Sequence, residues 1–236
     1  MYSAVIESPM TPESVNRYAR HLVLKEIGGP GQQALLAARV VIVGAGGLGG
    51  PAGLYLAAAG VGHITIIDDD QVDASNLQRQ VQFISSDIGM DKATIMADTL
   101  DDLNPDVKTR GIVDRVNAGN AHALLQGADI VVDGVDDFAS RFVTNDACLR
   151  LGIPLVSGAL SQWEGQLSVF DPARGTPCYQ CLFPEAPAPG LAPSCAEAGV
   201  LGPLPGVVGA MMAVETVKLI AGAGQPLLGE MLMVKG

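Results

Sequence analysis

The sequence is poor in positive charge. It contains 14 lysines and arginines against 25 aspartates and glutamates, which gives a formal net charge of −11. A surface with this balance repels polyanions, so it argues against nonspecific binding to nucleic acid and to an anionic membrane. Any polyanionic ligand must therefore be held by a local cluster of cations.

The sequence also lacks a long uninterrupted apolar run. Its N-terminus has no basic segment followed by an apolar core, so no signal peptide is expected. The longest apolar run near the C-terminus, residues 206–222, contains Glu215 and Lys218 and is shorter than the ~20 residues that a membrane span needs. We interpret this run as a buried or interface helix, and we expect a cytoplasmic protein.

Cysteine is scarce, with four residues in the whole chain. In a chain without a secretion signal, cysteines indicate metal binding or catalysis before they indicate disulfides. The three histidines show neither the spacing of a catalytic triad nor that of a metal site. We expect the histidines to be structural.

Predicted strands and helices alternate along the middle of the chain. The expected strands are 40–43, 63–67, 108–113, 129–133 and 154–158, and the expected helices are 48–59, 90–103, 117–126 and 139–151. This alternation predicts an α/β fold with a Rossmann-like, doubly wound, mostly parallel sheet. Because there is no internal repeat and no flexible linker, we expect residues 1–236 to form a single domain.

The two ends of the chain depart from this alternation. N-terminal helices are expected within residues 11–38, one starting at Thr11 and Pro12 and a second over 32–38. In the C-terminal part, residues 161–236, we expect an antiparallel strand over 165–170, a long loop over 176–205, a helix over 206–221 and a last strand over 229–234. The sheet should therefore be extended by antiparallel strands. A loop of this length is more often functional than idle.

A nucleotide-binding unit is expected at the start of the region 39–160. The strand 40–43 opens into Gly44-Ala-Gly-Gly-Leu-Gly49, which fits the spacing GxGxxG and begins a helix, and the next strand ends in Asp68. In such units backbone N–H groups face phosphate, and the carboxylate binds ribose hydroxyls. Taken alone, this unit is also typical of a dehydrogenase.

Three cations accompany this unit that a hydride-transfer enzyme does not need, namely Arg20, Arg79 and Lys92. An acidic pair, Asp136 and Asp137, follows the strand 129–133 at the carboxyl edge of the sheet, where the ligands of such sheets bind. Lys92 alone would be interpreted as a solvated residue at a helix start. The placement of the whole set favours a phosphate site.

The ordered set of motifs resembles the MoeB/ThiF/HesA family, the bacterial relatives of ubiquitin-activating enzymes. The motifs are GAGGLG at 44–49, SNLQRQ at 75–80, GQL at 165–167, CYQC at 178–181 and SCAEAG at 194–199. The resemblance extends from Arg17 to Gly222. The glycine turn alone is weak evidence, whereas the ordered set is specific.

The resemblance implies ATP- and Mg²⁺-dependent adenylation of the C-terminal Gly-Gly carboxylate of a ubiquitin-like sulfur carrier of the MoaD or ThiS type. The cations fit this reaction, because the carboxylate must approach a tetra-anionic triphosphate. One like-charge pair at 4 Å costs about 4 kcal/mol at an effective dielectric near 20. Whether the pathway leads to molybdenum cofactor, thiamine or another product depends on the carrier. A sulfurtransferase or cysteine desulfurase is a candidate further partner.

The resemblance also implies residue roles. Asp68 binds ribose, Lys92 contacts phosphate, Asp136 holds Mg²⁺, and Arg20 matches an arginine that reaches into the neighbouring subunit's site, which implies a homodimer. The implied nucleotide-binding set is Gly44, Gly46, Gly47, Gly49, Asp68, Ser75, Asn76, Leu77, Gln78, Arg79, Lys92, Asp136 and Asp137. The implied catalytic set is Arg20, Arg79, Lys92, Asp136 and Cys195.

Two features depart from the family pattern. The family commonly has asparagine where this chain has Asp137, which adds a negative charge that either alters Mg²⁺ binding or faces away. Cys178 and Cys181 have the spacing of half a Cys₄ zinc site, and no second pair is present in this sequence. Either a tail is missing from the chain or this member lacks zinc. Cys148 is expected in the core, and Cys195 is either a nucleophile toward the activated carrier or a non-essential loop cysteine.

Other functions stay open at this point. A family member that activates a different carboxylate, such as an RNA-linked one in tRNA-modifying dehydratases, fits the fold, although the net charge of −11 disfavours RNA. An NAD-dependent oxidoreductase explains the glycine turn and Asp68 but gives Arg79 and Lys92 no task. A noncatalytic scaffold that binds carriers would not need the charged set.

Overall fold

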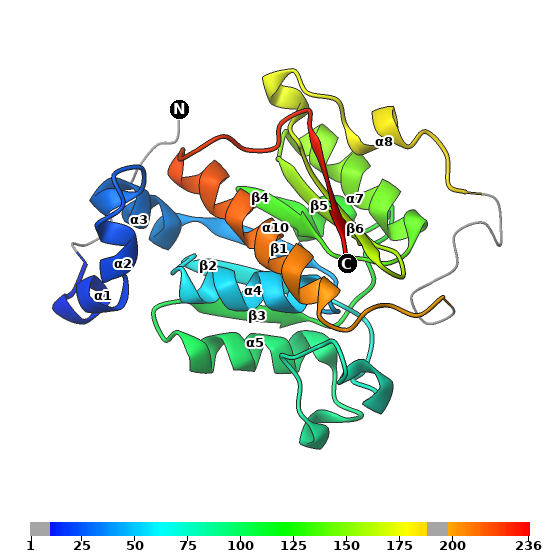
Figure 1. Ribbon diagram of the computed structural model, residues 1–236, viewed down its shortest axis with the longest axis horizontal. Coiled ribbons are helices and arrows are strands. Elements are labelled where there is room, and N and C mark those ends of the chain that lie inside the picture. Colours follow the sequence, from blue (N-terminus) through cyan, green and yellow to red (C-terminus); the bar gives the residue numbers. More distant parts are fainter. Residues whose placement is uncertain (1–9, 188–197) are drawn as a thin grey trace.

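Seven strands form one mixed sheet in the part of the chain that the structure describes, residues 10–187 and 198–236 of a computed structural model (Figure 1). The strand order is β3-β2-β1-β4-β5-β6-β7. The strands are β1 (Arg39–Val43), β2 (His63–Ile67), β3 (Lys108–Ile112), β4 (Ile130–Asp133), β5 (Leu155–Leu160), β6 (Glu164–Phe170) and β7 (Met231–Lys235). Strands β1 to β5 pair in parallel, and β6 and β7 are antiparallel to their neighbours. The predicted mostly parallel sheet with antiparallel C-terminal strands is confirmed.

Strand β1 is buried on both faces of the sheet. Val40 and Ile42 pack into the core on one face, and Val41 and Val43 pack into the core on the other. Side chains alternate between faces along a strand, so a strand covered on both sides is apolar throughout. This is why the segment shows a continuous apolar run.

Helices cover both faces of the sheet (Figure 1). One core is shared with α3 (Gly28–Ala37), α4 (Gly49–Ala58), α5 (Lys92–Leu103) and α10 (Leu204–Ala221). The opposite core is shared with α6 (Ala121–Leu125), α7 (Phe138–Leu151) and α8 (Tyr179–Leu182). Two short helices, α1 (Pro12–Arg17) and α2 (Ala19–Leu22), precede α3, and the 3₁₀ turns are Ala74–Asn76, Ser85–Asp87 and Pro172–Arg174.

Helix α10 is the one described helix that is long and apolar enough, by length and composition alone, to cross a membrane. Half of it is buried, and it packs against α4 and against β5 and β6. Its buried Glu215 accepts a hydrogen bond from the Leu227 N–H at 2.8 Å and forms an ion pair with Lys218. This packing agrees with the buried or interface helix predicted from the charged residues Glu215 and Lys218.

Most boundaries lie within two residues of the sequence prediction, and three segments differ from it more clearly. The helix expected over 117–126 is confined to α6, because the side chains of Asn117 and Asn120 accept backbone hydrogen bonds and form a turn before it. The second N-terminal helix begins at Gly28, since Pro30 fits the first turn of a helix, where N–H groups have no intrahelical partner. The expected loop 176–205 contains α8 and the first residues of α10, and residues 188–197 lie outside the described part.

Candidate active site

A cavity of about 450 Å³ opens at the carboxyl ends of the parallel strands. The cavity lies where β1 is flanked by β2 on one side and β4 on the other, so the order of the strands reverses there. Ligands of open α/β sheets bind at such reversals, and the volume lies within the ~300–1,000 Å³ of small-molecule sites. The predicted site residues that line it are Gly44, Gly46, Gly47, Asp68, Arg79, Lys92, Asp136 and Asp137.

The glycine turn closes the end of β1 tightly. Gly44 has a φ of +92°, and its N–H donates to the Ile67 carbonyl at 2.9 Å. A Cβ atom on Gly49, which lies outside the cavity lining, would be 1.8 Å from the Gly44 oxygen, so only glycine fits. Within the described chain, the N–H groups of Gly46 and Gly47 donate no hydrogen bond. Two free N–H groups next to a helix N-terminus suit an anion.

Asp68 is fixed beside this turn. Its Oδ2 accepts the Ala45 N–H at 2.7 Å, and its Oδ1 accepts the Asp70 N–H at 2.8 Å. Burial raises the pKa of Asp68, and the two backbone hydrogen bonds oppose that rise. The carboxylate therefore keeps a fixed orientation at the cavity wall, with lone pairs left for ligand hydroxyls.

Two of the three predicted cations line the same cavity, Lys92 and Arg79. Lys92 begins α5, its side chain is 7% exposed, and its Nζ forms a 2.8 Å ion pair with Asp70, which is 68% exposed. Arg79 donates from Nη1 to the Ser75 carbonyl at 3.0 Å. Both cations are held by neighbours on the segment between β2 and α5.

Besides Gly49, four predicted binding residues do not line the cavity: Ser75, Asn76, Leu77 and Gln78. The Asp73 carboxylate accepts the Ser75 N–H, and the Asn76 side chain accepts the Asp73 N–H, which closes a short 3₁₀ turn. Leu77 packs against the core. In the structure these residues build the turn that carries Arg79.

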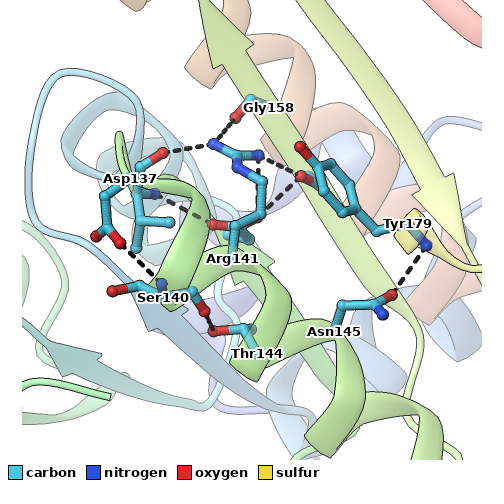
Figure 2. Close-up of polar contacts among 10 residues, drawn as sticks. Asp137, Ser140, Arg141, Thr144, Asn145, Gly158 and Tyr179 are labelled. Carbon is cyan, nitrogen blue, oxygen red and sulfur yellow. Dashed lines mark hydrogen bonds and ion pairs between the residues drawn. The ribbon is translucent and has the colours of Figure 1, made fainter. Parts of the chain in front are cut away.

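The two residues of the acidic pair, Asp136 and Asp137, have different surroundings. Asp136 lines the cavity and is exposed, and within the described chain its carboxylate has no hydrogen-bond or ion-pair partner, which fits a hard cation such as Mg²⁺. Asp137 caps α7, since its Oδ1 accepts the Ser140 N–H at 2.8 Å (Figure 2). Its Oδ2 lies 3.2 Å from Arg115. The charge that departs from the family pattern is thus paired with an arginine.

A buried arginine in the cavity wall, Arg141, was missed by the sequence analysis. Its guanidinium lies 3.0 Å from Asp133 and donates to Ser157 Oγ at 2.6 Å and to the Gly158 carbonyl at 3.0 Å. It also donates to the carbonyl of Val135, the residue before Asp136, and it stacks on the Tyr179 ring (Figure 2). Arg141 therefore joins the ends of β4 and β5 and fixes the loop that carries Asp136.

Arg20 lies far from this cavity. It is exposed on α2, and the α1–α2 segment is tied to Asp106, before β3, by hydrogen bonds from Ser14 at 2.9 Å and from Tyr18 at 3.2 Å. That contact is at the amino ends of the strands, whereas the cavity is at their carboxyl ends (Figure 1). Arg20 cannot serve the site of its own chain.

The cysteines are distributed over separate places. The sulfurs of Cys178 and Cys181 are 3.4 Å apart. Burial raises the pKa of the Cys178 thiol, but hydrogen bonds led by that from Cys181 outweigh it, so the pKa lies below its usual value. The described residues thus offer two of four zinc ligands, and a closed Cys₄ site is not formed among them. Cys148 is buried in α7, as expected, and Cys195 lies outside the described residues.

The sequence comparisons agree with this geometry. The model described as the ThiF family matches residues 18–236. The chain belongs to the ThiF family. It is 50% identical over 218 residues to the SAMP-activating enzyme E1 of Haloferax volcanii, which covers 92% of this chain and 80% of that protein. It is 46% identical over 227 residues to the sulfur carrier protein adenylyltransferase of Thermus thermophilus, with 94% and 84% covered.

A solved relative supports the fold assignment. The crystal structure of MccB from E. coli with ATP superposes with a TM-score of 0.80 at 26% identity, over 94% of this chain and 68% of that chain. The resemblance drawn from the sequence motifs is therefore confirmed at the level of family and fold.

The Arg141 cluster predicts a pH-dependent loss of stability. We expect Arg141→Met to lower the free energy of unfolding by about 3 kcal/mol at pH 7.5, because it leaves the buried Asp133 carboxylate without its cation. Burial already raises the pKa of Asp133, and loss of Arg141 raises it further. The loss should shrink as the pH falls and Asp133 takes up a proton, which urea unfolding at several pH values measures.

The matched control is the double variant Asp133→Asn/Arg141→Met, which has no buried carboxylate to leave unpaired. Its stability loss should be smaller than that of Arg141→Met at pH 7.5 and should not vary with pH. A single variant whose loss is the same at pH 5 and pH 7.5 would contradict this account.

Proposed function

We propose that this chain is an adenylyltransferase that uses ATP to activate the C-terminal Gly-Gly carboxylate of a small ubiquitin-like sulfur carrier. The observation that carries the proposal is the convergence of Asp68, Arg79, Lys92 and Asp136 around one glycine turn. It is supported by 46% identity to a sulfur carrier protein adenylyltransferase over 94% of this chain. We treat residues 1–236 as one adenylation domain.

Each wall of the cavity then has a task toward ATP. Asp68 receives the ribose hydroxyls, and the free N–H groups of Gly46 and Gly47 receive phosphate oxygens. Arg79 and Lys92 offset the phosphate charge, and Lys92 exchanges or shares its contact with Asp70 when phosphate arrives. Asp136 would hold Mg²⁺, which reduces the charge of the triphosphate.

The reaction is a substitution at the α-phosphorus. A carboxylate oxygen of the carrier forms a bond to that phosphorus, the bond to the β-phosphate oxygen breaks, and pyrophosphate leaves. The β5–β6 hairpin offers the approach, because its residues Leu160, Gly165 and Gln166 line the cavity beyond the glycine turn. Positioning and charge compensation supply most of the catalysis in such reactions.

A homodimer completes the site in this proposal. Since Arg20 lies at the opposite end of its own sheet, it can serve only the cavity of a second copy. Apolar side chains are exposed beside Arg20, at Val23 (75%) and Leu24 (47%), and on the segment that follows Arg79, at Val81 (68%) and Ile84 (65%). Two exposed apolar patches, one near the supplied arginine and one near the receiving site, suit a contact between copies.

The proposal also covers the type of carrier, the location of the protein and the source of the sulfur. The carrier is of the MoaD or ThiS type, the protein is cytoplasmic, and a sulfurtransferase or cysteine desulfurase supplies the sulfur that follows adenylation. Zinc at Cys178 and Cys181 needs two more ligands. A covalent role for Cys195 is tested by sulfur transfer in Cys195→Ala, whose adenylation should persist in either case.

The alternatives are less well supported. An oxidoreductase that uses NAD leaves Arg79, Lys92 and Asp136 without a task. Activation of an RNA-linked carboxylate conflicts with the net charge of −11.

Pyrophosphate exchange into ATP tests the proposal. We expect exchange only when Mg²⁺ and a carrier that ends in Gly-Gly are present, because the reverse reaction needs the carrier adenylate. Lys92→Met should reduce exchange by about 10²-fold or more, since it removes a cation from the phosphates. Lys108→Met is the matched control and should exchange like the wild type, because Lys108 is exposed at the start of β3 and does not line the cavity. Exchange that is equally fast without any carrier would refute the proposed substrate.

Mixing inactive subunits tests the role of Arg20. Arg20→Ala and Asp136→Ala should each lose most adenylation, although Arg20→Ala should still bind ATP. If Arg20 acts across a dimer, a mixture has complete sites in which the partner's Arg20 meets an intact Asp136. With random assortment about a quarter of wild-type activity should return, since half the dimers are mixed and each has one complete site. A mixture that stays inactive after subunit exchange, verified by mass spectrometry, would contradict the role across the interface.

A further inference from the structure

Gln82 contacts the glycine turn from a distant part of the chain. It follows the Arg79 segment and is 5% exposed. Its side-chain Nε2 donates to the Ala45 carbonyl at 2.7 Å and to the Gly46 carbonyl at 3.2 Å. Both acceptors are carbonyl oxygens, so the amide must turn its NH₂ group toward the turn.

These two bonds set the direction of two peptide planes. The Ala45 carbonyl and the Gly46 N–H belong to one peptide group, and the Gly46 carbonyl and the Gly47 N–H belong to the next. Both peptide bonds are trans, so the carbonyl and the N–H of each group point in opposite directions. Gln82 holds both carbonyls on the inner side, alone at Ala45 and together with the Gly50 N–H (3.0 Å) at Gly46, so both N–H groups are turned outward. Gly46 and Gly47 line the cavity, and their N–H groups are the free donors described above.

The arrangement is not optimal for stability. The Oε1 atom of Gln82 is buried and has no hydrogen-bond partner among the described residues. A Cβ on Gly50 would come within 2.1 Å of this Oε1, so the side chain also requires a glycine in the first turn of α4. A buried polar atom without a partner is costly, and its retention calls for a reason other than packing.

We infer that Gln82 is a positioning residue for phosphate binding: its amide fixes the Ala45–Gly46 and Gly46–Gly47 peptide planes so that two N–H groups face the phosphates. The inference rests on the proposed function only in that the cavity takes ATP. Gln82 also joins the two ligand-binding segments, because it lies on the segment that carries Arg79 and holds the glycine turn in place. A ligand without phosphate makes no use of these N–H groups.

Nucleotide binding by Gln82→Met tests the inference, with ATP and adenosine titrated separately by calorimetry. Methionine has a similar length and no donor, so the Ala45–Gly46 peptide plane loses its constraint, while the Gly46 carbonyl keeps only the hydrogen bond from the Gly50 N–H. We expect the Kd for ATP to rise about tenfold while the Kd for adenosine is unchanged. The wild type has one buried carbonyl oxygen without a partner, Oε1 of Gln82. The variant removes this oxygen but leaves the Ala45 carbonyl without its partner. The melting temperature should therefore stay close to that of the wild type.

The matched control is Gln32→Met. Gln32 is also fully buried, but both of its polar atoms are paired, Nε2 with the Ala59 carbonyl at 2.9 Å and Oε1 with the His21 ring at 3.0 Å. This variant should melt at a lower temperature and bind both ligands as the wild type does. Equal weakening of ATP and adenosine by Gln82→Met, or no weakening of either, would overturn the inference. A wild-type protein that binds no ATP would instead overturn the proposed function. The calorimetric test does not depend on pyrophosphate exchange with the carrier.

Discussion

The parallel pairing of β1 with β2 on one side and β4 on the other is the constraint on which the site depends. In this register Val43 lies beside both Ile67 and Asp133, so the three strands end at the same level. The residues that follow them, Gly44, Asp68 and Gly134, are brought together by backbone hydrogen bonds alone. A Cβ on Gly44 would lie 3.1 Å from the Gly134 carbonyl, which shows how closely the two loops approach. The apolar strands therefore place the polar loops.

The charge around the cavity depends on where individual side chains lie and not on the overall composition. The chain carries a net charge of −11, yet Arg79, Lys92, Arg115 and Arg141 all line one cavity. Each of the four is held by a neighbour: Lys92 by Asp70, Arg115 by Asp137, Arg141 by Asp133, and Arg79 by a backbone carbonyl. Such pairing keeps the cations oriented before a ligand arrives, which lowers the reorganisation that binding requires.

The residues assigned to the proposed site come from two opposite edges of the sheet. The glycine turn, Asp68, the cations and Asp136 belong to one sheet edge. Arg20 belongs to the opposite edge, where α1 and α2 are anchored to Asp106. In the proposed homodimer, the Arg20 of each copy would serve the cavity of the other.

The sequence by itself determined the features that depend on neighbouring residues. Apolar runs gave the strands, the glycine spacing gave the turn after β1, and Asp68 and Asp136 followed directly as residues at strand ends. These features are local because strand periodicity and turn geometry are set within a few residues. The order of motifs was specific enough to indicate the ThiF family, which the family match confirms.

Only the tertiary structure decided which side chains meet across the chain. Gln82 reaches a carbonyl 37 residues away, Arg115 pairs with the cap of α7, and Arg141 bonds to Gly158 in β5 from the first turn of α7. The tertiary structure also places Ser75 to Gln78 in the turn that carries Arg79, and not in the cavity wall where the sequence analysis expected them. No local pattern marks such contacts, because they arise where separate elements pack against one another. The physical reason is that the register of the sheet brings distant segments together. This register is known only once the strands are paired in the folded chain.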